Sequence, residues 1–201
     1  MTAPLLLDEL IPHADAVRTE HLLIDGDLAQ VYDAVRAADF MRTAEQQPVR
    51  ALFQLRALGE RVVSTVRRRP LPAPAPTATM RLADLGAHGE WVVLGERPPH
   101  EIAIGVVGRF WAGETSWETI DARDFAGFER PGLAKIAAGF SLRPYGAGRV
   151  LVSYECRTLA TDPQSRRAFL RYWRALSPFI GVVLRTQLRI VARTAAERAA
   201  R

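Results

Sequence analysis

The chain has 201 residues, of which 48% are hydrophobic, and this length and composition suffice for one domain with a sizeable core. Its formal net charge is +5, nearly all of it arginine, which bears on solubility and nonspecific association rather than on fold. The apolar runs are shorter than the roughly 18 residues that a membrane span needs. The one cysteine, Cys156, excludes an intramolecular disulfide. We therefore expect a cytoplasmic protein without a transmembrane segment.

The first quarter of the chain predicts one strand and two helices. After an N-terminal extension of residues 1–16, Val17–Ile24 is typical of a strand, and the aspartates at 25 and 27 are placed to cap a following helix. Apolar residues at helical spacing then predict a helix over 28–35. A second helix is expected from Pro48, which suits a first-turn position, to about Val66. Residues 70–79, rich in proline, predict an extended connector.

The middle of the chain changes to a period of two, which is typical of strands. Turn residues separate the segments and allow consecutive segments to pair as antiparallel hairpins. Consecutive antiparallel strands with one apolar face require a covering element on that face. The expected strands are Trp91–Glu96, Glu101–Trp111, a weaker one at Thr115–Ile120, Leu133–Arg143 and Arg149–Leu159.

The last forty residues predict the cover for this sheet. Asp162 followed by Pro163 is a helix start, because an aspartate caps the first turn and proline fits within it. Beyond it, apolar residues recur at steps of three, four or seven, which indicates an amphipathic helix of about 30 residues. Pro178 inside this helix predicts a bend of more than about 20°. The predicted architecture is α+β, with a curved antiparallel sheet wrapped around a long C-terminal helix.

This order of elements and several segments resemble the START-like or SRPBCC superfamily, also called the polyketide cyclase and lipid transport superfamily. The beginning, from Val17 to Phe40, is similar to the first strand and helix of its uncharacterised bacterial members. The C-terminal likeness rests on these residues: Tyr154-Glu155-Cys156-Arg157, Thr161-Asp162-Pro163, Phe169, Tyr172-Trp173, Ser177-Pro178, Arg185, Leu188 and Ile190. The resemblance implies a single helix-grip domain over residues 1–201, and a hydrophobic or amphipathic ligand held between the sheet and the terminal helix.

The first functional hypothesis is a binder of a lipid-like or polyketide-like small molecule. Bulky rings and apolar side chains line pockets that hold such ligands, although they also simply fill cores. Pocket residues are expected on the inward strand faces and on one stripe of the terminal helix. The candidates are Ile104, Phe110, Phe140, Tyr154, Phe169, Trp173, Leu176 and Ile180.

Two alternatives stay open. Glu155 and Arg157 lie two apart on a strand, so they share one face, opposite Tyr154 and Cys156. If that face points inward, Glu155, Arg157 or Tyr154 could serve as acid, base or anchor in a cyclase or aromatase. If the more apolar row with Tyr154 points inward, Glu155 and Arg157 form an outer ion pair. The second alternative is a surface protein whose arginines bind anionic lipid or, less favoured, nucleic acid.

Metal and cofactor sites are not indicated. The four histidines are scattered without ligand spacing, whereas structural zinc needs four ligands and catalytic zinc three. The glycine pairs at 86 and 89 and at 105 and 108 lack the strand-to-helix setting and the lysine of a phosphate loop. We therefore expect neither a metal nor a cofactor, and the sequence leaves the oligomeric state and the ligand open.

Overall fold

The computed structural model describes residues 4–40, 82, 90–111 and 115–200, and it has an α+β architecture. The predicted strands are present, while the helix expected near 48–66 and the connector at 70–79 lie outside the described residues. In chain order the elements are α1 (Leu6–Leu10), β1 (Ala16–Asp25), α2 (Leu28–Ala37), β2 (Val92–Arg97), β3 (Glu101–Arg109), β4 (Ser116–Glu118), α4 (Ala122–Phe125), β5 (Ala134–Pro144), β6 (Arg149–Ala160) and α5 (Pro163–Ala199).

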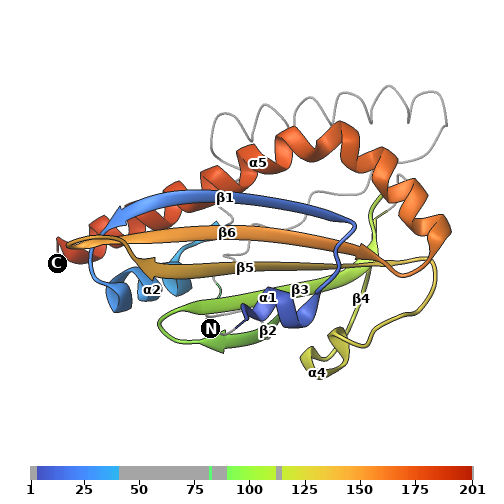
Figure 1. Cartoon of the computed structure of the whole chain (residues 1–201), viewed down its shortest axis with the longest axis horizontal. Helices are drawn as coiled ribbons and strands as arrows, with labels where there is room; N and C mark the ends of the chain where they lie inside the picture. Colours follow the sequence, from blue (N-terminus) through green and yellow to red (C-terminus); the bar gives the residue numbers. More distant parts are fainter. Residues whose placement is uncertain (1–3, 41–81, 83–89, 112–114, 201) are drawn as a thin grey trace.

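The six strands form one antiparallel sheet. Its order is β1-β6-β5-β3-β2, with β4 pairing the end of β3. The register places Tyr154 opposite both Glu20 of β1 and Phe140 of β5, and Phe140 opposite Ile102 of β3. The sheet is curved and the long helix α5 arches along it (Figure 1). The predicted helix-grip architecture is therefore confirmed.

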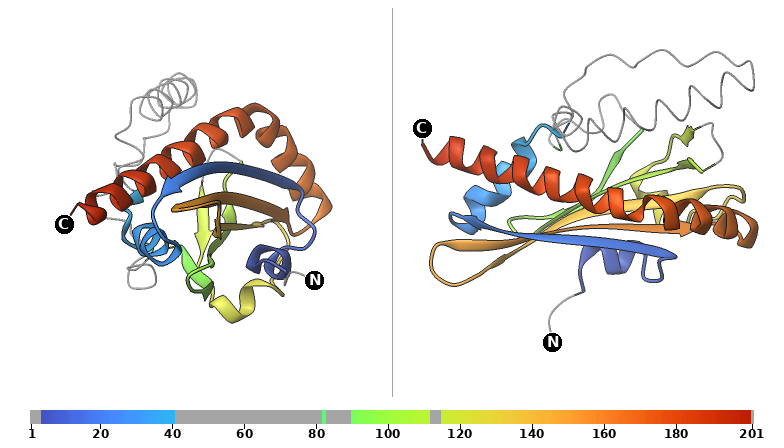
Figure 2. Two further views of the ribbon diagram at one scale, coloured as in Figure 1. Left: turned by 60° about the vertical axis from the view of Figure 1, so that its left-hand side comes forward. Right: turned by 90° about the horizontal axis from the view of Figure 1, so that it is seen from above.

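Helices cover both faces of the sheet. We call the face toward α5 and α2 the inner face, and the face toward α1 and α4 the outer face; α5 and α1 lie on opposite sides of the strands in Figure 2. The apolar run from Ile102 to Val107 in β3 explains this, because a strand buried on both faces needs apolar residues at successive positions. Ile102 and Ile104 belong to the inner core, whereas Ala103 and Val107 belong to the outer one.

The outer cover includes part of the N-terminal segment. Residues 1–16, expected as an extension, include α1, whose Leu7 is buried in the outer core together with Phe125 of α4. Arg157 holds α1 against the sheet, because its guanidinium donates to the Asp8 carboxylate at 2.7 Å and to the Ile11 carbonyl at 3.0 Å. The hydrogen bond from Arg157 also lowers the pKa of Asp8 below its usual value.

Helix α5 is longer than predicted and runs for 37 residues. Phe169, Leu184, Leu188 and Val191 are fully buried on its sheet-facing side. Pro178 lies inside this continuous helix, and Figure 1 shows α5 bending over the sheet. The size of the bend at Pro178 stays a prediction.

Asp162 caps the first turn of α5 and ties it to the loop before β5. Its carboxylate accepts hydrogen bonds from the backbone nitrogens of Gln164, Ser165 and Gly132 and from the Ser165 hydroxyl. Its pKa is lowered to about 2, and the hydrogen bonds from Ser165 are the largest cause. A carboxyl with a lowered folded-state pKa stabilises the fold above its unfolded pKa near 3.9.

This stabilisation is lost as the pH falls from about 4 to about 2, because the carboxylate becomes protonated and stops accepting these bonds. We therefore expect Asp162→Ala to lower the melting temperature at pH 7 and to lower it less at pH 2. Asp162→Asn keeps an acceptor for the cap and should lose less than Asp162→Ala at pH 7. Thermal unfolding followed by circular dichroism checks this. Equal effects of Asp162→Ala at both pH values would contradict it.

Candidate functional site

The inner face of the two central strands is apolar, and Tyr154 lies on it. Val150, Val152 and Tyr154 of β6 are buried in the inner core with Phe140 of β5. Cys156 packs against the same cluster. The structure thus settles which face of residues 149–159 points inward: it is the face with Tyr154 and Cys156, and Glu155 and Arg157 lie on the other.

An aromatic stack fills one end of the inner face. The rings of Phe140 and Tyr154 lie parallel with centroids 3.9 Å apart, and Phe40 stacks on Phe140 at 5.6 Å. All three are almost completely buried. Burial raises the pKa of the Tyr154 hydroxyl, so it stays protonated at neutral pH and can donate a hydrogen bond but cannot act as a base.

A second aromatic group, the distal cluster, lies where β3 and β4 meet the first turns of α5. Phe110 touches Phe169 at 5.8 Å between centroids, and Phe169 touches Trp173 at 5.9 Å. Phe169 is 1% exposed, whereas the other five rings are only partly buried. A ring cluster with one buried member borders solvent and does not form a closed core. The members are Phe110, Trp111, Trp117, Phe169, Tyr172 and Trp173.

Between these two aromatic groups the inner face carries small side chains. Ala138 of β5 lies opposite Cys156 of β6 on one side and Ile104 of β3 on the other. Cys156 in turn lies opposite Arg18 of β1. Burial raises the pKa of the Cys156 thiol to about 12. The thiolate nucleophile is therefore scarce at neutral pH, and Cys156 behaves as a small apolar residue here.

A charged cluster lies in this middle region, on the α5 side. The Arg18 guanidinium donates to the Glu20 carboxylate at 2.5 and 3.0 Å, and Arg185 of α5 pairs with the same carboxylate at 2.9 Å. Helix and strand approach closely at this point, because a Cβ on Gly181 would lie 2.4 Å from an Arg18 nitrogen. Arg18 keeps a 34% exposed side chain, whereas that of Glu20 is 14% exposed.

The predicted ligand-binding residues fall into two groups instead of one. Ile104, Phe140 and Tyr154 are buried in the inner core, and Ile180 is partly buried against it. The other candidates, Phe110, Phe169, Trp173 and Leu176, lie toward the N-terminal half of α5, the first three in the distal cluster.

The sequence analysis did not identify four residues of this region as candidate site residues: Arg18, Glu20, Gly181 and Arg185. A signal existed for two of them, because Arg18 and Glu20 alternate in phase with Leu22 and Ile24 on β1 and therefore share their face. The contact of Gly181 with Arg18 depends on how α5 crosses the sheet, and spacing in the sequence carries no such information.

Glu155 and Arg157 form the outer ion pair that the sequence offered as one of its two alternatives. Arg157 donates to Glu155 at 2.5 Å, and Glu155 also accepts from the Thr19 hydroxyl at 2.9 Å. Both side chains lie on the outer face beneath α1, so neither reaches a ligand between the sheet and α5. Within the described ranges, no group of three or more His, Cys, Asp or Glu side chains is arranged to hold a metal ion.

One helix in the described part of the chain, α5, is long and apolar enough to cross a membrane by length and composition. Core helices of soluble proteins also have such compositions. In this fold α5 packs Leu184, Leu188 and Val191 into the inner core. The expected absence of a transmembrane segment therefore stays a prediction.

Comparison with known proteins gives likeness in structure only. No family model matches the chain, and no curated protein matches its sequence. A hypothetical protein from Helicobacter pylori is 9% identical with a TM-score of 0.46, and the alignment covers 97% of each chain. A conserved protein from Geobacillus kaustophilus is 10% identical with a TM-score of 0.41, over 90% of this chain and 96% of that one.

The Zhui aromatase/cyclase from a Streptomyces species is 11% identical with a TM-score of 0.30, and the alignment covers 92% of this chain and 95% of that one. At these identities and TM-scores the likenesses say nothing of what this protein binds.

Proposed function

We propose that the protein binds a hydrophobic or amphipathic small molecule, lipid-like or polyketide-like, between the sheet and α5. The observation that carries the proposal is the change of side-chain size along the inner face. Aromatic rings stand at both ends, while Ala138 and Cys156 of the sheet carry small side chains in the middle, next to the place where Gly181 of α5 packs against Arg18. A flat apolar ligand fits between rings and over small side chains.

The charged cluster supports an amphipathic ligand over a purely apolar one. Glu20 is bonded by two arginines, so the cluster of Arg18, Glu20 and Arg185 carries a net positive charge. The guanidinium of Arg18 can donate to a carbonyl, phenol or carboxylate oxygen at one edge of the ligand. We propose Arg18 as the residue that orients the ligand and the distal cluster as the wall that its apolar end contacts.

The protonation and pairing of the titratable side chains on the inner face favour binding over catalysis. Tyr154 and Cys156 are protonated at neutral pH because burial raises the pKa of each, and the Glu20 carboxylate is occupied by two arginines. These three side chains leave a hydrogen-bond donor but no free base beside the proposed ligand; Glu96, a further inner-face carboxylate, accepts from the Tyr32 hydroxyl and lies 3.6 Å from Arg36. A polyketide cyclase or aromatase that enolises its substrate needs such a base.

A space-filling substitution tests the proposal. We expect Ala138→Phe to weaken the binding of 2-naphthol, a flat fluorescent probe, by at least about tenfold, because the new ring would take the place proposed for the ligand over Ala138. Arg143→Phe introduces the same ring on the same strand but on the exposed outer side, and it should bind the probe like the unchanged protein.

Fluorescence titration of 2-naphthol gives the two affinities. Overpacking at Ala138 costs about 1–3 kcal/mol, so thermal unfolding must show that the variant is folded during the titration. A folded Ala138→Phe variant that binds the probe with unchanged affinity would refute the site, and loss of binding in Arg143→Phe alone would move it to the outer face.

A further inference from the structure

A cavity of about 270 Å³ lies on the outer face of the sheet beside α1. It is separated from α5 by the sheet itself, and its floor is formed by β1, β6, β5 and β3. An engineered cavity of about 150 Å³ accepts benzene, so this one has room for a larger molecule of six to ten non-hydrogen atoms by a rough comparison.

The wall at the α1 end of this cavity is apolar. Leu5, Leu6 and Leu7 line it, and beneath them the floor consists of Ala103 and Gly139. Gly139 allows α1 to approach closely, because a Cβ there would lie 3.2 Å from Leu7 Cγ. An alkyl or aryl group placed at this end would contact apolar side chains and the backbone of β5 at Gly139.

The remainder of the floor carries hydrogen-bonding groups in a row across the strands. His21, Ser153, Ser141 and Glu101 are successive register partners on β1, β6, β5 and β3. His21 Nδ1 and Ser153 Oγ are hydrogen bonded at 2.8 Å. Arg143 follows Ser141 on the same face of β5 and also lines the cavity.

Within this cavity the place for an anion is the Arg143 guanidinium. Glu101 accepts from the Leu6 backbone nitrogen at 2.6 Å and lies 3.8 Å from Arg97, whose nearer partner is Glu9 at 2.7 Å. Glu155 shares the Arg157 guanidinium with Asp8. Each of these two carboxylates therefore already has a guanidinium partner, which it shares with a second carboxylate. The Arg143 side chain, in contrast, has no ion-pair or hydrogen-bond partner within the part of the chain that the structure describes.

We propose that this cavity binds a small organic carboxylate of about six to ten non-hydrogen atoms, and that the site is distinct from the one beneath α5. The carboxylate accepts hydrogen bonds from the Arg143 guanidinium and from the hydroxyls of Ser141 and Ser153. The apolar tail lies against Leu5, Leu6 and Leu7. The inference does not depend on the proposed function, because the side chains that it assigns to ligand contact lie on the outer face: Leu5, Leu6, Leu7, Ser141, Arg143 and Ser153.

Three probes with one tail separate charge from hydrophobicity: hexanoate, hexan-1-ol and hexylamine. We expect hexanoate to bind saturably and at least about tenfold more tightly than either of the others, because only its head group pairs with Arg143. Backbone amide NMR shifts should change at Ser141, Arg143 and Ser153 and stay unchanged in the second half of α5. The His21 ring signals should shift in the same titration.

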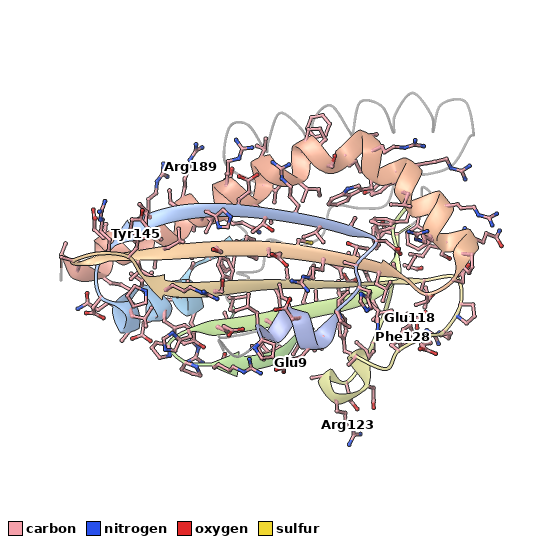
Figure 3. The ribbon with its side chains drawn as sticks, viewed as in Figure 1. Glu9, Glu118, Arg123, Phe128, Tyr145 and Arg189 are labelled. Atoms are coloured by element: carbon pink, nitrogen blue, oxygen red, sulfur yellow. The ribbon has the colours of Figure 1, made fainter. Side chains whose placement is uncertain are left out.

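Arg143→Ala should remove the preference for hexanoate over hexan-1-ol, whereas Arg189→Ala should keep it. Arg189 is the matched control because it is an exposed arginine on α5 whose side chain points away from the sheet (Figure 3). Arg143 is itself exposed, so we expect its replacement to leave the fold intact. The proposal is overturned if hexanoate does not saturate, if the three probes bind equally, or if Arg143→Ala keeps the preference.

This test is separate from that of the site beneath α5. Hexanoate should not compete with 2-naphthol, because the two probes occupy opposite faces of the sheet. Failure of 2-naphthol to bind would leave the hexanoate result unaffected, and failure of hexanoate would leave the inner site unaffected. Mutual competition would contradict the assignment of two separate sites.

Discussion

Trp173→Ala is expected to abolish 2-naphthol binding while lowering the free energy of unfolding by less than about 3 kcal/mol. A fully buried tryptophan loses about 3–5 kcal/mol on truncation to alanine, through lost burial and the cavity that remains. Trp173 is only partly buried and its ring contacts that of Phe169. Its truncation therefore removes less buried surface than truncation of a fully buried tryptophan. The same ring forms part of the proposed ligand wall, so its loss removes ligand contacts.

The control for this variant is Phe179→Ala. Phe179 lies on the same helix and is 39% exposed, and its truncation should leave the probe affinity unchanged. Urea unfolding of both variants gives the free energy of unfolding, and fluorescence titration gives the affinity for 2-naphthol. If Trp173→Ala is folded and binds the probe normally, Trp173 is not part of the site. If it unfolds, Trp173 is ordinary core.

Phe140→Ala is expected to have the largest effect on stability, with a loss of about 3–5 kcal/mol in the free energy of unfolding. Phe140 is 3% exposed and lies between two rings, stacking on Tyr154 at 3.9 Å and on Phe40 at 5.6 Å. Aromatic pairs of this kind add about 0.5–1.5 kcal/mol beyond their burial. Truncation therefore leaves a cavity and two rings without their partner.

The matched control is Ser141→Ala, the next residue of β5, whose side chain is on the outer face and only partly buried. Ser141→Ala should change the free energy of unfolding by no more than about 0.5 kcal/mol. Urea unfolding at equilibrium measures both values. A loss below about 1.5 kcal/mol for Phe140→Ala would mean that the ring borders open space, and Phe140 would then be a ligand contact instead of a core residue.

These two variants divide the predicted pocket residues by their burial. Phe140, Tyr154 and Phe169 are almost fully buried and hold the inner core together. Trp173 and Ile180 are partly exposed, so they keep surface that a ligand can cover. The sequence predicts all five as lining of one pocket, because periodicity reports which side of its strand or helix a residue is on and not whether neighbours have already filled the space.

The strands and the terminal helix could be predicted because their periods extend over many residues. The alternation of Ile136, Ala138, Phe140 and Leu142 identifies one face of β5, and the Asp162-Pro163 pair marks the start of α5. The short helices could not be predicted in this way. With five and four residues, α1 and α4 span about one turn each, which is too short to show a helical period.

The charged and aromatic clusters depend on contacts between distant segments. Phe110 and Phe169 meet only because β3 ends close to where α5 begins, and Arg18 meets Gly181 only because α5 crosses β1 closely. The outer cavity likewise requires the four-strand register that aligns His21, Ser153 and Ser141. None of these juxtapositions is visible in residue spacing within one segment.

Mapping of 2-naphthol by amide NMR on the full chain tests most directly the claim that a small molecule binds between the sheet and α5. The account predicts shift changes at Trp173, Ile180 and Gly181 of α5 and at Ala138 and Cys156 of the sheet, which saturate with one common affinity. Outer-face amides such as those of Ser141 and Ser153 should stay unchanged. Saturable changes confined to the outer face, or no saturable change in any amide, would contradict it.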